Sequence, residues 1–166
     1  MNFYTQNGWA GSNYDSNLSI ADICKNIRSY CKQFKGYKFS VRKINYLKIS
    51  VELKECPVEI TNEKSMFAYL ENNQFGTYYI QGEGNKSWFE LTTEQKESEC
   101  KKVVDCWSKY KQFHGVPKNQ TWLNPEVEEV LRSVYTYMQS FNYDDSEGMI
   151  DYFDTNFYHS FEIDIK

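Results

Sequence analysis

An aromatic and acidic tract near the C-terminus holds the residues of this chain that are best suited to chemistry. Residues 141–166 carry seven carboxylates and one lysine, a local net charge of −6. Carboxylate oxygens can bind Mg²⁺ or Ca²⁺, but the tract lacks the alternating ligand order and the closing glutamate of an EF-hand loop. A solvated acidic loop and an acidic recognition surface are the stronger interpretations, and we expect no metal and no cofactor.

Aromatic side chains are interleaved with the carboxylates of this tract. Aromatic residues are enriched at the buried centres of protein interfaces, where they supply much of the binding energy. Together with negative charge, they could anchor a basic protein that normally grips nucleic acid. The predicted partner-binding surface consists of Tyr143, Asp144, Asp145, Glu147, Asp151, Tyr152, Phe153, Asp154 and Tyr158.

Positive charge gathers at the other end of the chain, where residues 1–54 have a net charge of +6. Cations on a predicted helix and hairpin could neutralise phosphates and form a nucleic-acid-binding surface. The overall pI near 5.3 opposes general nucleic-acid binding, and no aromatic platform is evident beside the cations. The solvated face of a helix is the competing interpretation. The cations concerned are Lys25, Arg28, Lys32, Lys35, Lys38, Arg42 and Lys48.

The residues most often used in catalysis have no suitable neighbours in this sequence. His114 follows a predicted helix C-terminus, where positive charge is stabilising, and His159 lies on the apolar side of a predicted strand. The five cysteines form no CxxC pair, and Cys24 and Cys31 have the spacing of core positions on a helix. No glycine-rich phosphate loop, GxSxG or HExxH motif occurs. We therefore expect a non-enzymatic protein.

Helices and strands that would position these residues follow from periodicity and capping signals. Helices are predicted at 19–34, near 64–70, from 92 to about 113, and at 125–140, where Asn124 and Pro125 begin the last one. Glycine and proline at 36, 115 and 117 mark helix ends. Alternating apolar and polar residues predict a hairpin of 37–43 with 46–54 and a final strand at 157–165. The turn Gly82-Glu83-Gly84-Asn85 predicts a second hairpin, of 76–81 with 86–91.

These elements predict an α+β fold, a small antiparallel sheet packed against amphipathic helices with a helix and hairpin segment inserted at about 56–123. Residues 1–18 are expected to be a loose lead-in, followed by a single domain at 19–166. We find no apolar run long enough to span a bilayer and no signal peptide, so we expect a cytoplasmic protein of a bacterial host without a membrane partner.

Two segments also resemble a known family. Residues 22–42, a helix leading into Gly36-Tyr37-Lys38-Phe39-Ser40-Val41-Arg42, resemble the opening of a large polyvalent protein-associated domain family of phages and conjugative elements. Asn142-Tyr143-Asp144-Asp145-Ser146 and Asp151-Tyr152-Phe153-Asp154, followed by Phe157-Tyr158, are similar to its closing segment. Residues 56–123 have no counterpart, which implies an insertion. The family has no established activity, and the resemblance implies the company of mobile elements and of proteins that protect an invading element from host defence.

Three functional hypotheses follow, in order of preference. The first is a mobile-element protein that inhibits a host defence protein or ribonucleoprotein complex, an anti-CRISPR or anti-restriction role, by docking its acidic aromatic surface into a basic channel. The second is a nucleic-acid-binding accessory module that uses the basic helix and hairpin. A metal-dependent nuclease built on the acidic cluster is the weakest.

Overall fold

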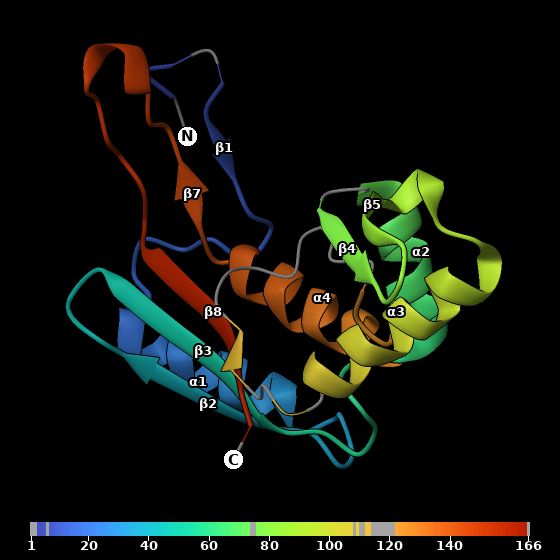
Figure 1. The fold of residues 1–166 in the computed structure, drawn as a ribbon. Coiled ribbons are helices and arrows are strands. Elements are labelled where there is room, and N and C mark those ends of the chain that lie inside the picture. The colour runs from blue at the N-terminus through green and yellow to red at the C-terminus, as the bar shows by residue number, and fades with distance from the viewer. Residues whose placement is uncertain are drawn as a thin grey trace. The chain divides into compact units, whose positions relative to one another are not determined.

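The computed structural model of the chain describes residues 3–5, 7–73, 76–107, 109, 112–113 and 122–165. It confirms the α+β class and divides the chain into two compact units (Figure 1). Unit 1 comprises Met1–Glu55, Gln112–Val116 and Val130–Lys166, and unit 2 comprises Cys56–Lys111 and Pro117–Glu129. Unit 2 begins at the residue where the predicted insertion begins. No helix in these described ranges is long and apolar enough to cross a membrane.

Unit 1 opens with helix α1 (Ile20–Cys31), which begins at the predicted capping box. The Ser19 hydroxyl accepts from the Asp22 N–H, and the Asp22 carboxylate accepts from the Ser19 N–H, both at 3.2 Å. These bonds satisfy two backbone donors that a helix start leaves open. The helix ends before the predicted residue 34, because the chain turns from Lys32 to Gly36, whose φ is 82°.

The main sheet of unit 1 has the strand order β2-β3-β8-β6. Its strands are β2 (Lys38–Lys43), β3 (Lys48–Glu55), β8 (Tyr158–Asp164) and β6 (Gln112–Phe113). The β2–β3 hairpin is antiparallel as predicted, but β8 runs parallel to β3, with Lys48 opposite Tyr158. The sheet is therefore mixed rather than antiparallel. A parallel pair needs a long crossover, and here more than a hundred residues, including a helix, separate the two strands.

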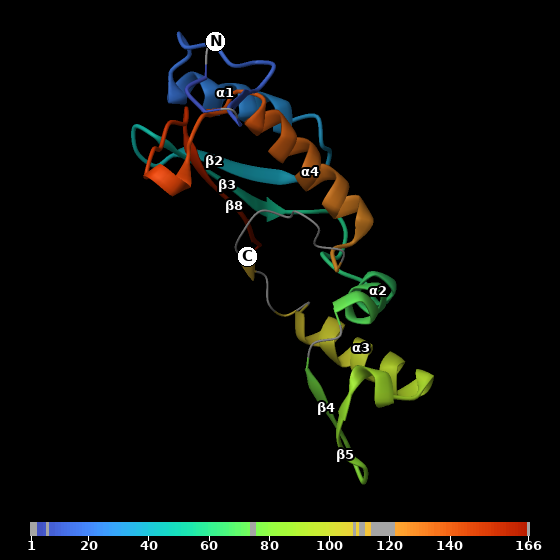
Figure 2. The same cartoon turned by 90° about the horizontal axis from the view of Figure 1, so that it is seen from above.

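One face of this sheet is apolar and carries the core of unit 1. Helix α1 and the unit 1 part of helix α4 (Pro125–Gln139) cover that face (Figure 2). The two helices meet through Tyr30, whose ring stacks on Tyr137 with centroids 3.9 Å apart and whose hydroxyl lies 2.8 Å from that of Ser133. His159 lies on the same face, half-buried, with Nδ1 3.3 Å from the Gln139 amide nitrogen. The fully buried sheet residues are Ile49, Val51, Leu53 and Phe161.

Unit 2 packs two helices and a small hairpin around Trp88, which is fully buried. Its elements are α2 (Glu63–Asn73), β4 (Thr77–Ile80), β5 (Gly84–Ser87), the 3-10 turn η1 (Trp88–Glu90) and α3 (Thr93–Trp107). The second predicted strand stops early, because a capping box of Ser87 and Glu90 begins a helical turn at Trp88. The predicted extension of α3 to about 113 is wrong, because Gln112–Phe113 form strand β6. The predicted end signals Gly115 and Pro117, and His114, lie outside the described residues.

Residues 1–18 were predicted to be a loose lead-in, but the described part of this stretch is hydrogen-bonded to the rest of unit 1. Strand β1 (Trp9–Ala10) pairs with β7 (Tyr143–Asp144). The Gly11 N–H then donates to Asn142 O, and the Asn13 N–H donates to Ser140 O, each at 2.8 Å. These bonds tie the lead-in to the end of α4 and to the acidic tract, a pairing between segments far apart in sequence.

Gly11 is required for this close approach, so Gly11→Ala is expected to destabilise unit 1. A Cβ at position 11 would fall against the backbone of Ser140 and Gln139, which cannot move as a flexible side chain could. We expect a loss of about 1–3 kcal/mol in the free energy of unfolding, measured by urea denaturation. Gly148→Ala is the matched control, because a Cβ there meets no atom, and its effect should stay within about 0.5 kcal/mol.

Candidate functional site

The acidic tract folds back on itself into an arm, here defined as residues 143–155, which lies beside β1 (Figure 1). Its two limbs are joined by the Asp145 N–H donating to Asp154 O at 2.8 Å. Closer to the end, the Glu147 N–H donates to Tyr152 O at 2.7 Å, and the Tyr152 N–H returns a bond to Glu147 O at 3.1 Å. These backbone bonds fix a tight turn, which we call the arm tip (148–153).

The arm tip is formed by the 3-10 turn η2 (Gly148–Ile150) and by a left-handed residue, Asp151, with φ 53°. Aspartate tolerates this backbone conformation better than most residues other than glycine. The Glu147 carboxylate accepts from the Met149 N–H at 3.1 Å and so caps the turn. The local sequence therefore builds a defined tip at which side chains 149 and 150 face outward.

The base of the arm is closed by Asn142, which sequence analysis did not identify. Its side-chain oxygen accepts from the N–H groups of Tyr143 at 3.0 Å and Phe157 at 3.1 Å, and its amide donates to Phe157 O at 3.2 Å. The residue is 4% exposed. A buried amide with these bonds fixes where the two limbs of the arm leave the core. Its position between an apolar helix end and the tract was the available signal.

Asp145 was predicted to lie on a recognition surface, but it is 4% exposed and serves as an anchor. Its carboxylate accepts from the N–H groups of Tyr4 and Thr5, the latter at 2.9 Å, and from the Thr5 hydroxyl. Burial opposes its ionisation, but these hydrogen bonds outweigh burial and lower the pKa of Asp145. Its charge is directed at the N-terminal segment and not at a partner.

Other carboxylates of the predicted surface also shape the arm. Asp154 accepts from the hydroxyls of Tyr143 at 2.6 Å and Tyr152 at 3.2 Å, and the first bond, together with burial, raises the pKa of Tyr143. Asp144 accepts from the Ser146 N–H at 2.8 Å. The tract is thus less a free acidic loop than a folded element whose carboxylates hold its turns. Within the described ranges, no group of His, Cys, Asp or Glu side chains is arranged to hold a metal ion.

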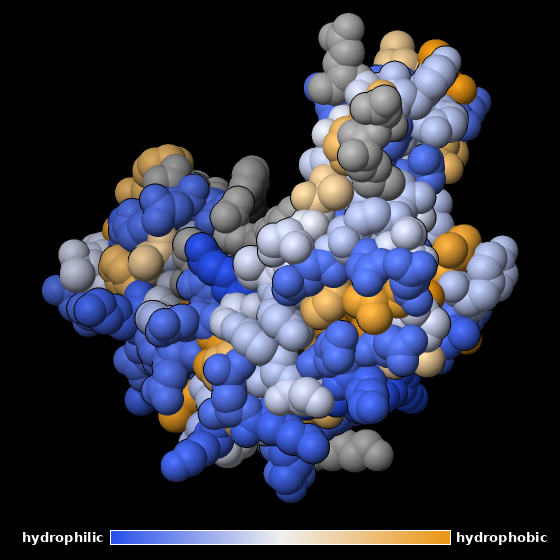
Figure 3. Space-filling view, turned by 180° about the vertical axis from the view of Figure 1, so that it is seen from behind, coloured by the Kyte–Doolittle hydropathy of each residue, from blue (hydrophilic) through white to orange (hydrophobic). Residues whose placement is uncertain are grey.

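Exposed apolar side chains distinguish the arm tip from the rest of the tract. Met149 is 91% exposed, Ile150 60% and Phe153 65%. Hydrophobic residues gather at the end of the arm, at the upper right of Figure 3. Of the predicted surface residues, Asp151, Phe153 and Tyr158 are exposed, whereas Met149 and Ile150 were missed. Two adjacent apolar residues enclosed by Gly148 and Asp151 were the sequence signal for them.

The predicted basic surface is partly used by internal contacts. The Arg28 guanidinium donates twice to Val41 O, at 3.0 Å and 2.7 Å, and thereby ties α1 to β2. Lys38 pairs with Glu55 at 2.7 Å, and Arg42 pairs with Glu52. The remaining cations make no ion pair with any residue the structure describes; they are Lys25, Lys32, Lys35 and Lys48.

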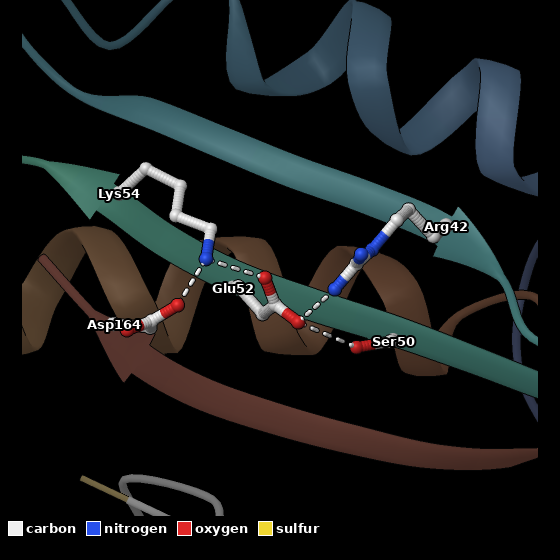
Figure 4. Close-up of polar contacts among 5 residues, drawn as sticks. All are labelled: Arg42, Ser50, Glu52, Lys54 and Asp164. Carbon is white, nitrogen blue, oxygen red and sulfur yellow. Dashed lines mark hydrogen bonds and ion pairs between the residues drawn. The ribbon is translucent and has the colours of Figure 1, made fainter. Parts of the chain in front are cut away.

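The face of the sheet away from the helices carries a charged cluster centred on Glu52 (Figure 4). Glu52 is 7% exposed, and its carboxylate lies between Arg42 and Lys54, whose Nζ is 2.7 Å from Oε2. Lys54 also pairs with Asp164 on the neighbouring strand. The hydrogen bond that Lys54 donates to Glu52, aided by Arg42, lowers the pKa of Glu52. The hydrogen bond that Lys54 donates to Asp164 raises the pKa of Lys54. Both groups therefore stay charged near neutral pH, which suits them poorly to proton transfer.

Glu52→Gln is expected to lower stability at neutral pH by about 1–2 kcal/mol, because it removes the shared partner of two cations. The loss is below that of a fully buried pair, since Arg42 is half-exposed and can reach water. A lowered pKa means that the contribution of Glu52 is present above about pH 4.5 and is lost as pH falls through its folded-state pKa.

The wild-type and Glu52→Gln unfolding free energies, measured by urea denaturation at several pH values, should therefore converge in acid. Glu55→Gln, which removes an exposed ion pair with Lys38, is the control and should change stability by less than about 1 kcal/mol. A constant difference between wild type and Glu52→Gln down to pH 2 would contradict the assignment.

These observations define an α+β fold in which an amphipathic helix leads into an antiparallel hairpin and a helical unit follows. The family model of large polyvalent protein associated domain 29 matches residues 18–112. Because the match covers more than half of the chain, the chain belongs to this family. No curated protein and no solved structure matches it.

The matched residues show which parts of the chain the family defines. They include α1, the β2–β3 hairpin and residues 56–112, for which the resemblance had offered no counterpart. They stop before α4, the arm and β8. The family assignment confirms the suspected family through its opening segment and associates the chain with mobile elements. The segment that resembled the family's closing residues, 142–158, lies outside the matched range, so that part of the resemblance stays a prediction.

Proposed function

We propose that this chain is a non-enzymatic protein of a mobile element that binds a host defence protein or ribonucleoprotein complex through its arm tip and inhibits it. The observation that carries the proposal is the exposed apolar group Met149, Ile150 and Phe153 on a turn fixed by backbone bonds. Apolar side chains gathered on an exposed surface mark interaction sites, and a fixed turn binds with little ordering cost.

Charge supports a basic partner. The arm contains five carboxylates and neither lysine nor arginine, so it carries a net negative charge and potential, although Asp145 and Asp154 are turned to internal donors. Such a potential speeds association with a basic surface and disfavours acidic ones. Complexes that grip nucleic acid present basic channels, and occupation of such a channel by the arm would block nucleic-acid binding. The membership in a polyvalent protein family supports the mobile-element part of the proposal.

Phage plating tests the inhibitory role directly. The full chain is expressed in a strain with an active CRISPR or restriction system and in a matched strain that lacks it, and both are challenged with a targeted phage. We expect the chain to raise plating efficiency in the defence-competent strain and to leave it unchanged in the matched strain. Equal plating with and without the chain, across the defence systems tested, would overturn the inhibitory role.

A pull-down from a lysate of the same defence-competent strain tests the mode of binding. The tagged full chain should retain a CRISPR or restriction subunit after nuclease treatment, because the contacts proposed are between proteins. Loss of that subunit on nuclease treatment would contradict docking through the arm tip, since the association would then depend on nucleic acid.

A further inference from the structure

A small pocket lies where the chain leaves α1 and enters β2, on a part of unit 1 that the proposed function does not use. Its volume is about 360 Å³, within the range of small-molecule sites. Its lining combines three cations, two aromatic rings and a buried cysteine. The lining residues are Arg28, Cys31, Lys32, Tyr37, Lys38 and Phe39.

The cations of this pocket can hold an anionic group. Arg28 is fixed by its two bonds to Val41 O, which use two of the five N–H donors of a guanidinium and leave the others in a set position. Lys32 is exposed and makes no ion pair with the described residues, while the pair of Lys38 with Glu55 is exposed and therefore weak. A fixed guanidinium with two mobile ammonium groups is suited to a phosphate.

The aromatic rings add a second requirement for the ligand. Tyr37 and Phe39 are half-buried and line the same pocket as the cations, which supplies the aromatic platform that the sequence did not reveal. Bases stack on such rings in proteins that bind single-stranded nucleic acid. Exposed cations outside the pocket, Lys25 and Lys35, could follow a chain of further phosphates.

We propose that this pocket binds a nucleotide unit, with the phosphate held by Arg28, Lys32 and Lys38 and the base against Tyr37 and Phe39. The nucleotide could be free or belong to a single strand, because the pocket chemistry is the same for both. This inference is independent of the arm: a failure of nucleotide binding would leave the proposed function of the arm tip untouched, and a failure of the arm-tip experiments would leave this inference untouched.

The test is calorimetric titration of the full chain at low salt with adenosine 5′-monophosphate, inorganic phosphate and a six-nucleotide single strand. We expect Lys32→Gln to weaken binding of all three by about tenfold. Lys25→Gln, which removes an equal charge from α1 outside the pocket, should leave binding of the mononucleotide and of phosphate unchanged. Amide chemical-shift changes caused by the mononucleotide should cluster within residues 28–41.

Phe39→Leu separates stacking from charge, since it removes the ring and keeps an apolar side chain. This variant should weaken binding of the mononucleotide by about tenfold and leave the affinity for inorganic phosphate unchanged. If this variant fails to fold, the comparison of Lys32→Gln with Lys25→Gln tests the proposal.

The comparison of ligands shows whether the nucleotide is free or part of a strand. If the single strand binds far more tightly than the mononucleotide, with strong salt dependence, the natural ligand is a strand; if the two affinities are equal, it is the free nucleotide. Absence of mononucleotide binding, or equal effects of the two lysine variants on mononucleotide binding, would overturn the proposal.

Discussion

Replacing Met149, Ile150 and Phe153 together with serine is expected to reduce affinity for the captured defence subunit by about a hundredfold or more. The three side chains are exposed in the free protein, so their burial on binding would supply much of the interface energy. Their replacement should change the free energy of unfolding by no more than about 0.5 kcal/mol relative to wild type, because none of the three side chains is part of the core. The measurement is surface plasmon resonance with the purified subunit.

A matched control is available on the same unit. Ile44 and Tyr46, in the turn between β2 and β3, are 52% and 76% exposed, and their double replacement with serine removes exposed apolar side chains away from the arm. This control should bind as wild type does. Equal weakening by the tip and control variants would show that general surface hydrophobicity, and not the arm tip, governs binding.

Loss of the Asp145 carboxylate is expected to release the N-terminal segment from the arm. Asp145→Asn replaces a buried anion that accepts from Tyr4, from the Thr5 N–H and from the Thr5 hydroxyl with an amide that carries no charge and fewer acceptor sites. Hydrogen bonds to an ionised group are stronger than neutral ones, so the Tyr4 and Thr5 amide hydrogens should exchange with solvent at least about tenfold faster.

Hydrogen exchange followed by mass spectrometry measures this release, and Asp151→Asn provides the comparison. Asp151 is exposed at the arm tip, so its neutralisation should leave N-terminal exchange unchanged and act on partner association instead. Because the pKa of Asp145 is lowered, its carboxylate supports the segment above about pH 3.8, and the same release is expected in wild type as pH falls further, through the folded-state pKa. Unchanged exchange in Asp145→Asn would show that strand β1 alone holds the segment.

Local signals in the sequence predicted much of the fold. The Ser19 and Asp22 capping box, the alternation of the 37–54 hairpin and the Asn124–Pro125 start of α4 were all confirmed, because each depends on contacts within a few residues. The capping box at Ser87 and Glu90 acts over the same short range, yet we predicted a strand there, because the glycine-rich turn at 82–85 indicated a hairpin.

The candidate site was predicted less completely than the fold. Composition located the acidic tract and its aromatic residues, but it assigned every carboxylate to one surface. In the structure Asp145 and Asp154 are turned to internal donors, and Met149 and Ile150 carry the exposed apolar area. Whether a side chain in a loop faces solvent or the protein interior depends on which turn the backbone adopts, and composition does not specify that turn.

Residue types and their spacing were enough to predict the α+β class, the charge at each end, the helix starts and the family, since all of these are local in the chain. Tertiary structure alone decided that β8 joins β3 in parallel, that the N-terminal stretch pairs with the arm, and that Tyr37 and Phe39 share a pocket with three cations. Each of these depends on contacts made when the packed core brings separate segments together, and no local pattern records which segments meet.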